Sequence, residues 1–208
     1  MIKLCIATGN QGKVREMKEL LSGLDIQVVS LKDFENLKEV PETGTSFLEN
    51  SCQKCEGYAK QTSTVCLADD SGLCVDALNG APGIYSARFA KDDKEKCLKL
   101  LDLMEDKNDR NAHFNCFATL YFPEGVPEHI LKSNLDFQPV SNNIICCVGV
   151  LEGEIARETK GSEGFGFDPV FLVKDTGKHL AEMTSEEKNA ISHRGQAMRK
   201  IKKILELL

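Results

Sequence analysis

The stretch IKLCIATGNQGKVREMKELL, residues 2–21, decides the fold class of this 208-residue chain. Its first six residues are apolar apart from Lys3, which is typical of a buried strand. From Val14 onward apolar residues recur at helical spacing, and Gly23 then provides a helix stop. A second apolar run, Ile26–Ser30, follows shortly afterwards. The order strand, turn, helix, strand predicts two parallel strands joined by a helix, and therefore an α/β fold.

The composition is that of an ordinary globular enzyme, with 41% hydrophobic and 28% charged residues. The formal net charge of −6 argues against binding along a nucleic-acid backbone, which needs a broad basic face. No apolar run approaches the ~18 residues that cross a bilayer, and the N-terminal run is too short for a signal peptide. The nine cysteines are therefore expected to be reduced thiols. We expect a cytoplasmic protein that binds neither a membrane nor a nucleic-acid polymer.

Helical and strand patterns continue without a repeat or a clean linker, which predicts a single domain over residues 1–208. Ser46 and Glu49 form a capping-box pattern that begins a second helix. Further helices are expected over 94–104 and 192–208, and strands over 114–122, 144–151 and 154–158. The polar segment 123–143 contains three prolines and is expected to be a surface excursion.

Two adjacent acids, Asp69 and Asp70, follow the short apolar run Val65–Leu67. The strand is expected to end here, and residues at strand ends often form the binding sites of α/β proteins. Adjacent carboxylates repel each other unless a cation or a proton separates them. Oxygen ligands of this kind suit Mg²⁺ or Mn²⁺. The pair therefore indicates a divalent-metal site, with an acidic surface turn as the alternative.

The segment Thr8–Lys13 lies between the first strand and the first helix, where free N–H groups and the helix dipole favour an anion. Its spacing matches neither the P-loop nor the dinucleotide-binding fingerprint. We expect a phosphate-binding loop, with an ordinary capping turn as the alternative. On the second helix, Ser46, Asn50 and Lys54 recur at four-residue steps and share one side. That side either lines a cleft or faces solvent.

Glycines alternate with aromatic residues in the segment Gly161–Pro169 (GSEGFGFDP). Glycine allows the backbone to approach a ligand closely, and an aromatic ring can stack on a planar base. Packing around a hairpin turn is the alternative. Lys188, His193 and Arg194 gather near the start of the last helix, where the helix dipole disfavours cations. Binding of keto or phosphate oxygens would account for that cluster.

Taken together, these blocks resemble the inosine triphosphate pyrophosphatase family (RdgB-like enzymes) across nearly the whole chain. Each block alone is weakly specific, whereas the ordered set is highly specific. The matching blocks are Ala7–Lys13 (ATGNQGK), Glu42–Gly44 (ETG), Phe47–Asn50 (FLEN), Ala68–Leu73 (ADDSGL), Gly80–Arg88 (GAPGIYSAR), Gly164–Pro169 (GFGFDP) and Ser192–Gly195 (SHRG). The chain departs from the family at Pro41, where some members carry an acid, and in segment 123–143, which is longer than the usual connection.

The resemblance implies an α/β fold with a two-lobed mixed sheet, flanked by helices and with a central cleft. It implies Mg²⁺-dependent hydrolysis of a nucleoside triphosphate to the monophosphate and pyrophosphate, with ITP, dITP and XTP preferred. It also implies a homodimer. A Maf-like pyrophosphatase acting on dTTP or UTP is the nearest alternative. A nucleotide sensor without turnover is an alternative from another class.

Carried onto this sequence, the resemblance assigns Asp70 as the central acid, which binds Mg²⁺ and orients or deprotonates the attacking water. Glu42 is expected to be a metal ligand, with Asp69 in support. The phosphates are expected to contact Thr8, Gly9, Asn10, Gln11, Gly12, Lys13, Lys54 and Ser71.

The base is expected to stack on Phe165. The same wall is expected to contain Gly166, Phe167 and Asp168. The base edge is expected to meet Lys188, His193 and Arg194. Hypoxanthine and xanthine offer these donors the O6 acceptor, whereas adenine would leave them unpaired at a cost of ~1–3 kcal/mol per group.

Overall fold

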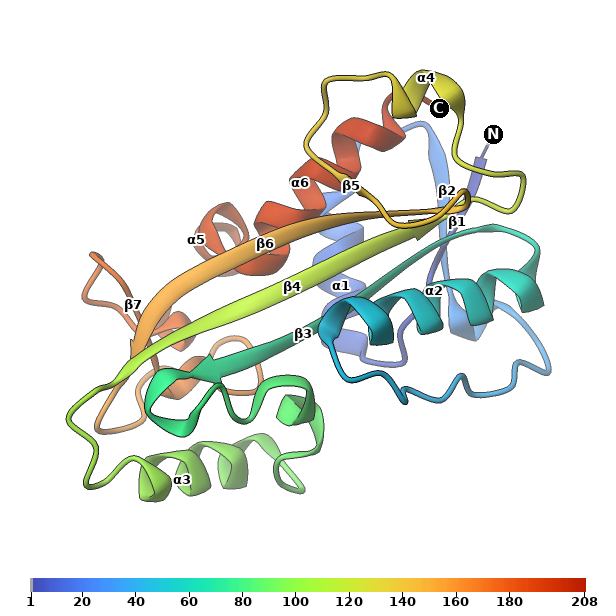
Figure 1. The fold of residues 1–208 in the computed structure, drawn as a ribbon. Helices are drawn as coiled ribbons and strands as arrows, with labels where there is room; N and C mark the ends of the chain where they lie inside the picture. Colours follow the sequence, from blue (N-terminus) through green and yellow to red (C-terminus); the bar gives the residue numbers. More distant parts are fainter. Residues whose placement is uncertain (1) are drawn as a thin grey trace. The chain divides into compact units, whose positions relative to one another are not determined.

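The computed structural model describes residues 2–208, which form a mixed sheet with helices around it (Figure 1). The sheet has seven strands in the order β2-β1-β3-β4-β6-β5, and β7 pairs with β6. β1 pairs in parallel with both β2 and β3, whereas β6 pairs antiparallel with β5 and β7. The predicted α/β fold with a mixed sheet is therefore confirmed.

The strands are β1 (Ile2–Ile6), β2 (Ile26–Ser30), β3 (Val65–Val75), β4 (Asn111–Tyr121), β5 (Gln138–Pro139), β6 (Ile144–Ile155) and β7 (Phe171–Val173). The α-helices are α1 (Gln11–Leu20), α2 (Phe47–Thr62), α3 (Asp93–Leu103), α4 (Glu128–Leu131), α5 (Ser185–Ile191) and α6 (His193–Leu205).

The chain divides into two compact units. Unit 1 contains the residues up to Asp70 together with 116–148 and 196–208, and unit 2 contains 71–115 and 149–195. Strands β3, β4 and β6 and helix α6 contribute residues to both units. The single domain expected over residues 1–208 stays a prediction.

In unit 1 the sheet lies between two helical layers, and β1 shows how side-chain alternation produces them. Leu4 and Ile6 belong to a core cluster with the buried faces of α1 and α6. Cys5 and Ala7 belong to a second cluster, whose helical members come from α2. Because successive strand residues point to opposite faces, α2 covers one face while α1 and α6 cover the other.

Unit 2 has a hydrophobic core of its own, built around α3. Cys97 and Leu100 of this helix join Leu73 of β3 in the cluster. The rings of Phe114 and Phe171 meet in the same core, with their centroids 4.7 Å apart. Short strand β7, which pairs with β6, thereby contributes to this core.

Strand β3 is longer than the sequence predicts. It runs from Val65 to Val75 and does not end at Ala68. Leu73 and Val75 are fully buried, so the strand continues into the core of unit 2 after the polar residues. Asp69 and Asp70 therefore lie inside a strand, and the expectation of a strand end at this point is wrong.

The C-terminal elements also differ from the prediction. The separate strand expected over 154–158 does not form, because β6 continues as far as Ile155. The helix expected over 192–208 covers His193–Leu205 and is preceded by a further helix, α5, capped by Thr184. The segment 123–143 contains the short elements α4 and β5.

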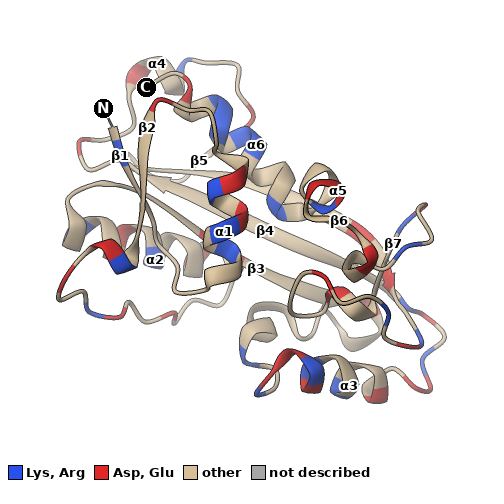
Figure 2. Cartoon of the chain, turned by 180° about the vertical axis from the view of Figure 1, so that it is seen from behind, with Lys and Arg blue, Asp and Glu red and all other residues tan. Residues whose placement is uncertain are grey.

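Charged residues of both signs are interspersed along α1, α2 and α3 (Figure 2). This pattern is typical of solvated helix faces. Within residues 2–208 no helix combines the length and the apolar character that a membrane span requires.

Candidate active site

The predicted phosphate loop begins α1, and Asn10 is its N-cap. The Asn10 Oδ1 atom accepts hydrogen bonds from the N–H groups of Gly12 (2.9 Å) and Lys13 (3.2 Å). The N–H of Asn10 in turn donates to Oγ1 of Thr8 (3.3 Å). Gly9, Asn10 and Gln11 are exposed, and a Cβ added to Gly9 would meet no atom within 4 Å. The segment is thus a capped turn with open space next to Gly9.

The two adjacent acids of β3 have separate partners. Asp69 is fully buried, and its Oδ2 lies 2.9 Å from the ammonium nitrogen of Lys13 in α1. Asp70 is 7% exposed and lies near Lys54 of α2, whose ammonium nitrogen is 3.6 Å from Oδ1. The two carboxylates thus turn to opposite faces of the sheet, as successive strand residues do. Because each acid has a lysine, their adjacency alone does not require a metal.

Glu42 brings a second carboxylate to Lys54. Its Oε2 lies 3.4 Å from the Lys54 nitrogen, so this ammonium is near the carboxylates of both Glu42 and Asp70. The Glu42 side chain is 36% exposed, whereas that of Lys54 is 11% exposed. One cation therefore already occupies the space between two acids that come from different segments of unit 1.

Asn50 holds these segments together. Its Nδ2 donates to Asp70 Oδ2 (3.2 Å), and its Oδ1 accepts the N–H of Gly44 (2.8 Å). A Cβ on Gly44 would lie 2.6 Å from Glu49 Cβ and 2.8 Å from Asn50 Oδ1, so only glycine fits this close approach. The loop carrying Glu42 is thereby fixed to the start of α2.

Burial raises the pKa of Asp70 above its usual range. The nearby ammonium groups of Lys54 and Lys13 and the hydrogen bond from Asn50 oppose this rise, while Glu42 adds to it. The result is a carboxyl group whose charge is sensitive to any further cation placed beside it.

A divalent metal would find two protein carboxylates here, from Glu42 and Asp70. Among residues 2–208, no three or more His, Cys, Asp or Glu side chains are grouped to hold a metal ion. A metal at this place would therefore take its other oxygen ligands from water or from a bound substrate. Mg²⁺ in phosphate-handling proteins is commonly bound in this way.

The predicted base-binding residues of unit 2 gather around Asp168. Its Oδ2 accepts the N–H of Phe165 (2.9 Å) and lies 2.7 Å from the ammonium of Lys188. The Phe165 ring has Lys188 Nζ at 4.7 Å and Arg194 Cζ at 5.5 Å from its centroid. A Cβ on Gly164 would lie 2.0 Å from Asp168 Oδ2, so the loop can close on this carboxylate only with glycine there.

The remaining predicted residues of this group support the loop from the core. Phe167 is 3% exposed, and its ring centroid lies 5.7 Å from that of Phe89. His193 is also buried, and its ring stacks on Phe114 with centroids 4.8 Å apart and an interplanar angle of 8°. Ser71, which was predicted to contact the phosphates instead, is half-buried and follows Asp70 in β3.

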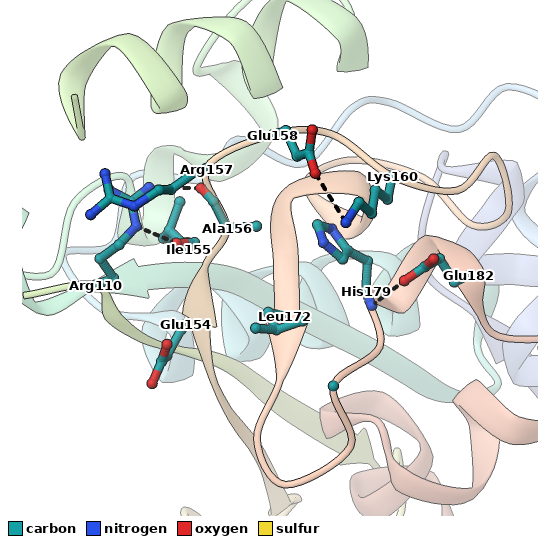
Figure 3. A pocket seen from close by; sticks show the side chains of 11 residues that line it. Arg110, Glu154, Ile155, Ala156, Arg157, Glu158, Lys160, Leu172, His179 and Glu182 are labelled. Carbon is teal, nitrogen blue, oxygen red and sulfur yellow. Dashed lines mark hydrogen bonds and ion pairs between the residues drawn. The ribbon is translucent and has the colours of Figure 1, made fainter.

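A cavity of about 570 Å³ lies elsewhere in unit 2 and contains none of the predicted site residues (Figure 3). The guanidinium of Arg110 donates to the main-chain carbonyls of Ile155 and Ala156 on its wall, and to that of Met104 at the end of α3. His179 Nδ1 lies 2.7 Å from the carbonyl oxygen of Pro169. These polar groups hold the β6–β7 region together.

Comparisons with known proteins identify the family. The Ham1 family model matches residues 4–204 of this chain. The chain belongs to the Ham1 family. The family resemblance drawn from the ordered sequence blocks is therefore confirmed, and the Maf-like alternative is set aside.

Similar proteins match this Ham1 chain over nearly its full length. A dITP/XTP pyrophosphatase of Bacillus anthracis is 43% identical over 206 residues, which cover 97% of this chain and 95% of the relative. A solved Ham1 protein structure from Coxiella burnetii matches with a TM-score of 0.84 at 38% identity and covers 100% of both chains. The Ham1 protein of Staphylococcus aureus matches with a TM-score of 0.82 at 36% identity and covers 98% of both chains.

Sequence reasoning noted Asn50 only as a possible cleft-lining residue, and it assigned no role to Asp93 and Cys97 of this Ham1 chain. Asn50 shares one side of α2 with Lys54, and that four-residue spacing was the available signal. Asp93 and Cys97 of α3 contact Gly166, a partner about 70 positions later, and no local pattern connects them.

Proposed function

We propose that this Ham1 family member is a nucleoside-triphosphate pyrophosphatase acting on deaminated purine nucleotides such as ITP, dITP and XTP. Hydrolysis of the α–β phosphoanhydride consumes one water and gives the nucleoside monophosphate and pyrophosphate. The observation that carries the proposal is the buried Asp70, which shares the ammonium of Lys54 with Glu42. The name of the Bacillus anthracis relative, dITP/XTP pyrophosphatase, supports the same activity.

Mg²⁺ is the proposed cofactor, with Glu42 and Asp70 as its protein ligands. Both carboxylates fit this role because they already lie within 3.6 Å of one cationic nitrogen. When bound, Mg²⁺ would supply charge neutralisation at the phosphates and favour formation of the nucleophile at neutral pH.

Asp70 is the residue proposed to orient the attacking water and accept its proton. The contacts with Asn50 and Lys54 fix both of its carboxylate oxygens. Burial raises its pKa towards the working pH, which makes the carboxylate a stronger base. Lys54 and Lys13 limit that rise and help to keep the carboxylate ionised.

The triphosphate is proposed to meet Lys13, Lys54 and the turn that begins α1. Asn10 already accepts the N–H groups of Gly12 and Lys13 as a helix cap. The turn would therefore hold phosphate oxygens chiefly through its remaining main-chain N–H groups and the Lys13 ammonium. Thr8, Gln11 and Ser71 are proposed as further polar contacts.

The base is proposed to stack on Phe165, with Lys188 and Arg194 donating to the purine O6. Both cations are almost fully buried, at 5% and 3% exposure, so a base edge that presents an acceptor to them is favoured over one that presents another donor. A 6-keto purine presents such an acceptor, whereas adenine presents a donor amine. His193 is proposed to complete this edge, while Gly166, Phe167 and Asp168 shape the loop.

The assembly and location of the chain remain proposals. We infer a cytoplasmic homodimer that acts on a free nucleotide and has no nucleic-acid or membrane partner. The net charge of −6 supports the absence of a nucleic-acid partner.

The proposal is tested by measuring pyrophosphate release from ITP, XTP, GTP, ATP, dTTP and UTP in parallel, with Mg²⁺ and with EDTA. Metal-dependent turnover of ITP and XTP well above the other substrates is expected. A preference for dTTP or UTP would replace the purine assignment. Tight binding of ITP without release of pyrophosphate would indicate a nucleotide sensor.

A further inference from the structure

The loop that carries Phe165 contains two glycines in the left-handed region of backbone conformation. The φ angle is +78° at Gly164 and +67° at Gly166. Glycine adopts such angles readily, and it also loses the most conformational freedom when it is held in one of them. A well-ordered Phe165 ring therefore requires contacts that hold this loop from outside.

Helix α3 holds both main-chain polar groups of Gly166. The Oδ2 atom of Asp93 accepts the Gly166 N–H at 2.8 Å. The Sγ of Cys97 donates to the Gly166 carbonyl oxygen at 3.4 Å. Asp93 and Cys97 are four residues apart, so they lie on the same side of the helix and face the same peptide group.

The other side of Phe165 is held by Asp168. This carboxylate accepts the N–H of Phe165 at 2.9 Å and also contacts Lys188. The side chain of Asp168 thus binds the N–H of Phe165. The side chains of Asp93 and Cys97 bind both main-chain polar groups of Gly166. Both ends of the Phe165 segment are restrained, one by Asp168 and one by α3.

We propose that Asp93 and Cys97 are positioning residues that set the orientation of Phe165 and thereby the affinity of the enzyme for the purine ring. This inference rests on the proposed function, in which Phe165 stacks on the base. Neither residue touches the substrate; they act through Gly166.

The protonation states of the two side chains suit these roles. Burial, and then the carboxylates of Asp93 and Asp168, raise the pKa of Cys97 to about 11, so the thiol keeps the hydrogen that it donates. Burial also acts to raise the pKa of Asp93, but the Gly166 N–H and the ammonium of Lys96 outweigh it and hold the pKa below its usual 3.8. Asp93 is therefore an ionised acceptor at neutral pH.

The test compares Asp93→Ala and Cys97→Ala with the conservative variants Asp93→Asn and Cys97→Ser. KM and kcat are measured with ITP. Asp93→Ala is expected to raise KM about tenfold, as for a lost hydrogen bond to a charged group, with kcat within about twofold. Asp93→Asn and Cys97→Ser keep an acceptor and a donor, so they are expected to restore most of the affinity.

Asp92 provides a matched control. It caps the same helix by accepting the N–H of Glu95 at 2.8 Å, and its neighbour Asp93 is the residue that contacts Gly166. Asp92→Ala weakens α3 without removing the contact to Gly166, so KM is expected to stay at the wild-type value. An equal rise of KM in Asp92→Ala would show that general loosening of α3 is the cause and would overturn the proposal.

Hydrogen exchange of the peptide covering residues 164–168 gives a readout that does not depend on turnover. Faster exchange is expected in Asp93→Ala and Cys97→Ala, but not in Asp92→Ala. If Asp93→Ala fails to fold, Cys97→Ala carries the test. Faster exchange with an unchanged KM for ITP contradicts the proposal.

Phe165→Ala separates this inference from the proposed function. If wild type hydrolyses ITP and Phe165→Ala raises KM while Asp93→Ala and Cys97→Ala do not, only the positioning role fails. If wild type does not hydrolyse ITP, or Phe165→Ala keeps the wild-type KM, the underlying functional assignment fails.

Discussion

The ammonium nitrogen of Lys13 lies 2.9 Å from Oδ2 of Asp69, a side chain that is completely buried in β3. The next residue along the strand, Asp70, turns to the opposite face and meets Lys54 and Asn50. The sheet therefore separates two acids that are adjacent in the sequence. Asp69 anchors a lysine of the turn that begins α1, while Asp70 carries the proposed chemistry.

Lys13→Ala is expected to destabilise the protein by about 3–5 kcal/mol, because it removes the cation next to a buried carboxylate. The measurement is urea unfolding of the two proteins. Lys18→Ala, an exposed change on the same helix, is the control and should stay within about 0.5 kcal/mol of wild type. Equal stability of the two variants would refute a structural role for the Lys13–Asp69 pair.

Asp70→Asn is expected to keep the fold and lose turnover of ITP by a factor of about 10²–10⁴, the usual contribution of a positioned general base. The amide has nearly the shape of the carboxylate and can still accept the hydrogen bond from Asn50. Thermal unfolding checks the fold, and initial rates check the chemistry. A variant with nearly the wild-type rate defeats the assignment of Asp70.

Asn50→Ala is expected to lower both stability and turnover, because it removes the contacts with Asp70 and Gly44 together. The stability loss should be about 1–3 kcal/mol, as for buried polar groups that lose a partner. Asn50→Asp keeps an acceptor for the Gly44 N–H but places a carboxylate beside Asp70. It should therefore recover part of the stability and little of the turnover; full recovery of both would show that the donor to Asp70 is dispensable.

The stability contributed by Asp93 is expected to depend on pH. Its pKa is lower in the folded protein than the usual 3.8, so its contribution is present above that value and is lost as the pH falls through the lowered pKa. The difference in unfolding free energy between wild type and Asp93→Asn should thus be constant near about pH 6 and shrink below about pH 4. Urea titrations across this pH range measure this difference. A difference that grows as the pH falls would contradict the prediction.

The fold was largely predictable because its first elements have strong local signals. The apolar run of β1 and the helical spacing of α1 lie within residues 2–21, and both elements form in the structure. The length of β3 was not predictable in the same way. The acidic residues Asp69 and Asp70 are typical of a strand end. Within the strand their charges are balanced by Lys13 and Lys54, which come from distant parts of the chain.

The capped turn of the candidate site was predictable from a short local motif, whereas the long-range contacts around the candidate residues were not. The capped turn before α1 is visible from Asn10 and the following residues alone. The hydrogen bond between Asp93 and Gly166 joins positions 73 residues apart, and no pattern in either local segment predicts it. Long-range hydrogen bonds of this kind depend on packing rather than on local sequence.

The most direct test of the account is phosphorus NMR of ITP during hydrolysis by the wild-type protein with Mg²⁺, with Asp70→Asn in parallel. The account predicts that the α–β bond breaks, so that the resonances of IMP and pyrophosphate appear together, and that Asp70→Asn nearly abolishes both. Formation of IDP and orthophosphate, or an undiminished rate in Asp70→Asn, would contradict it.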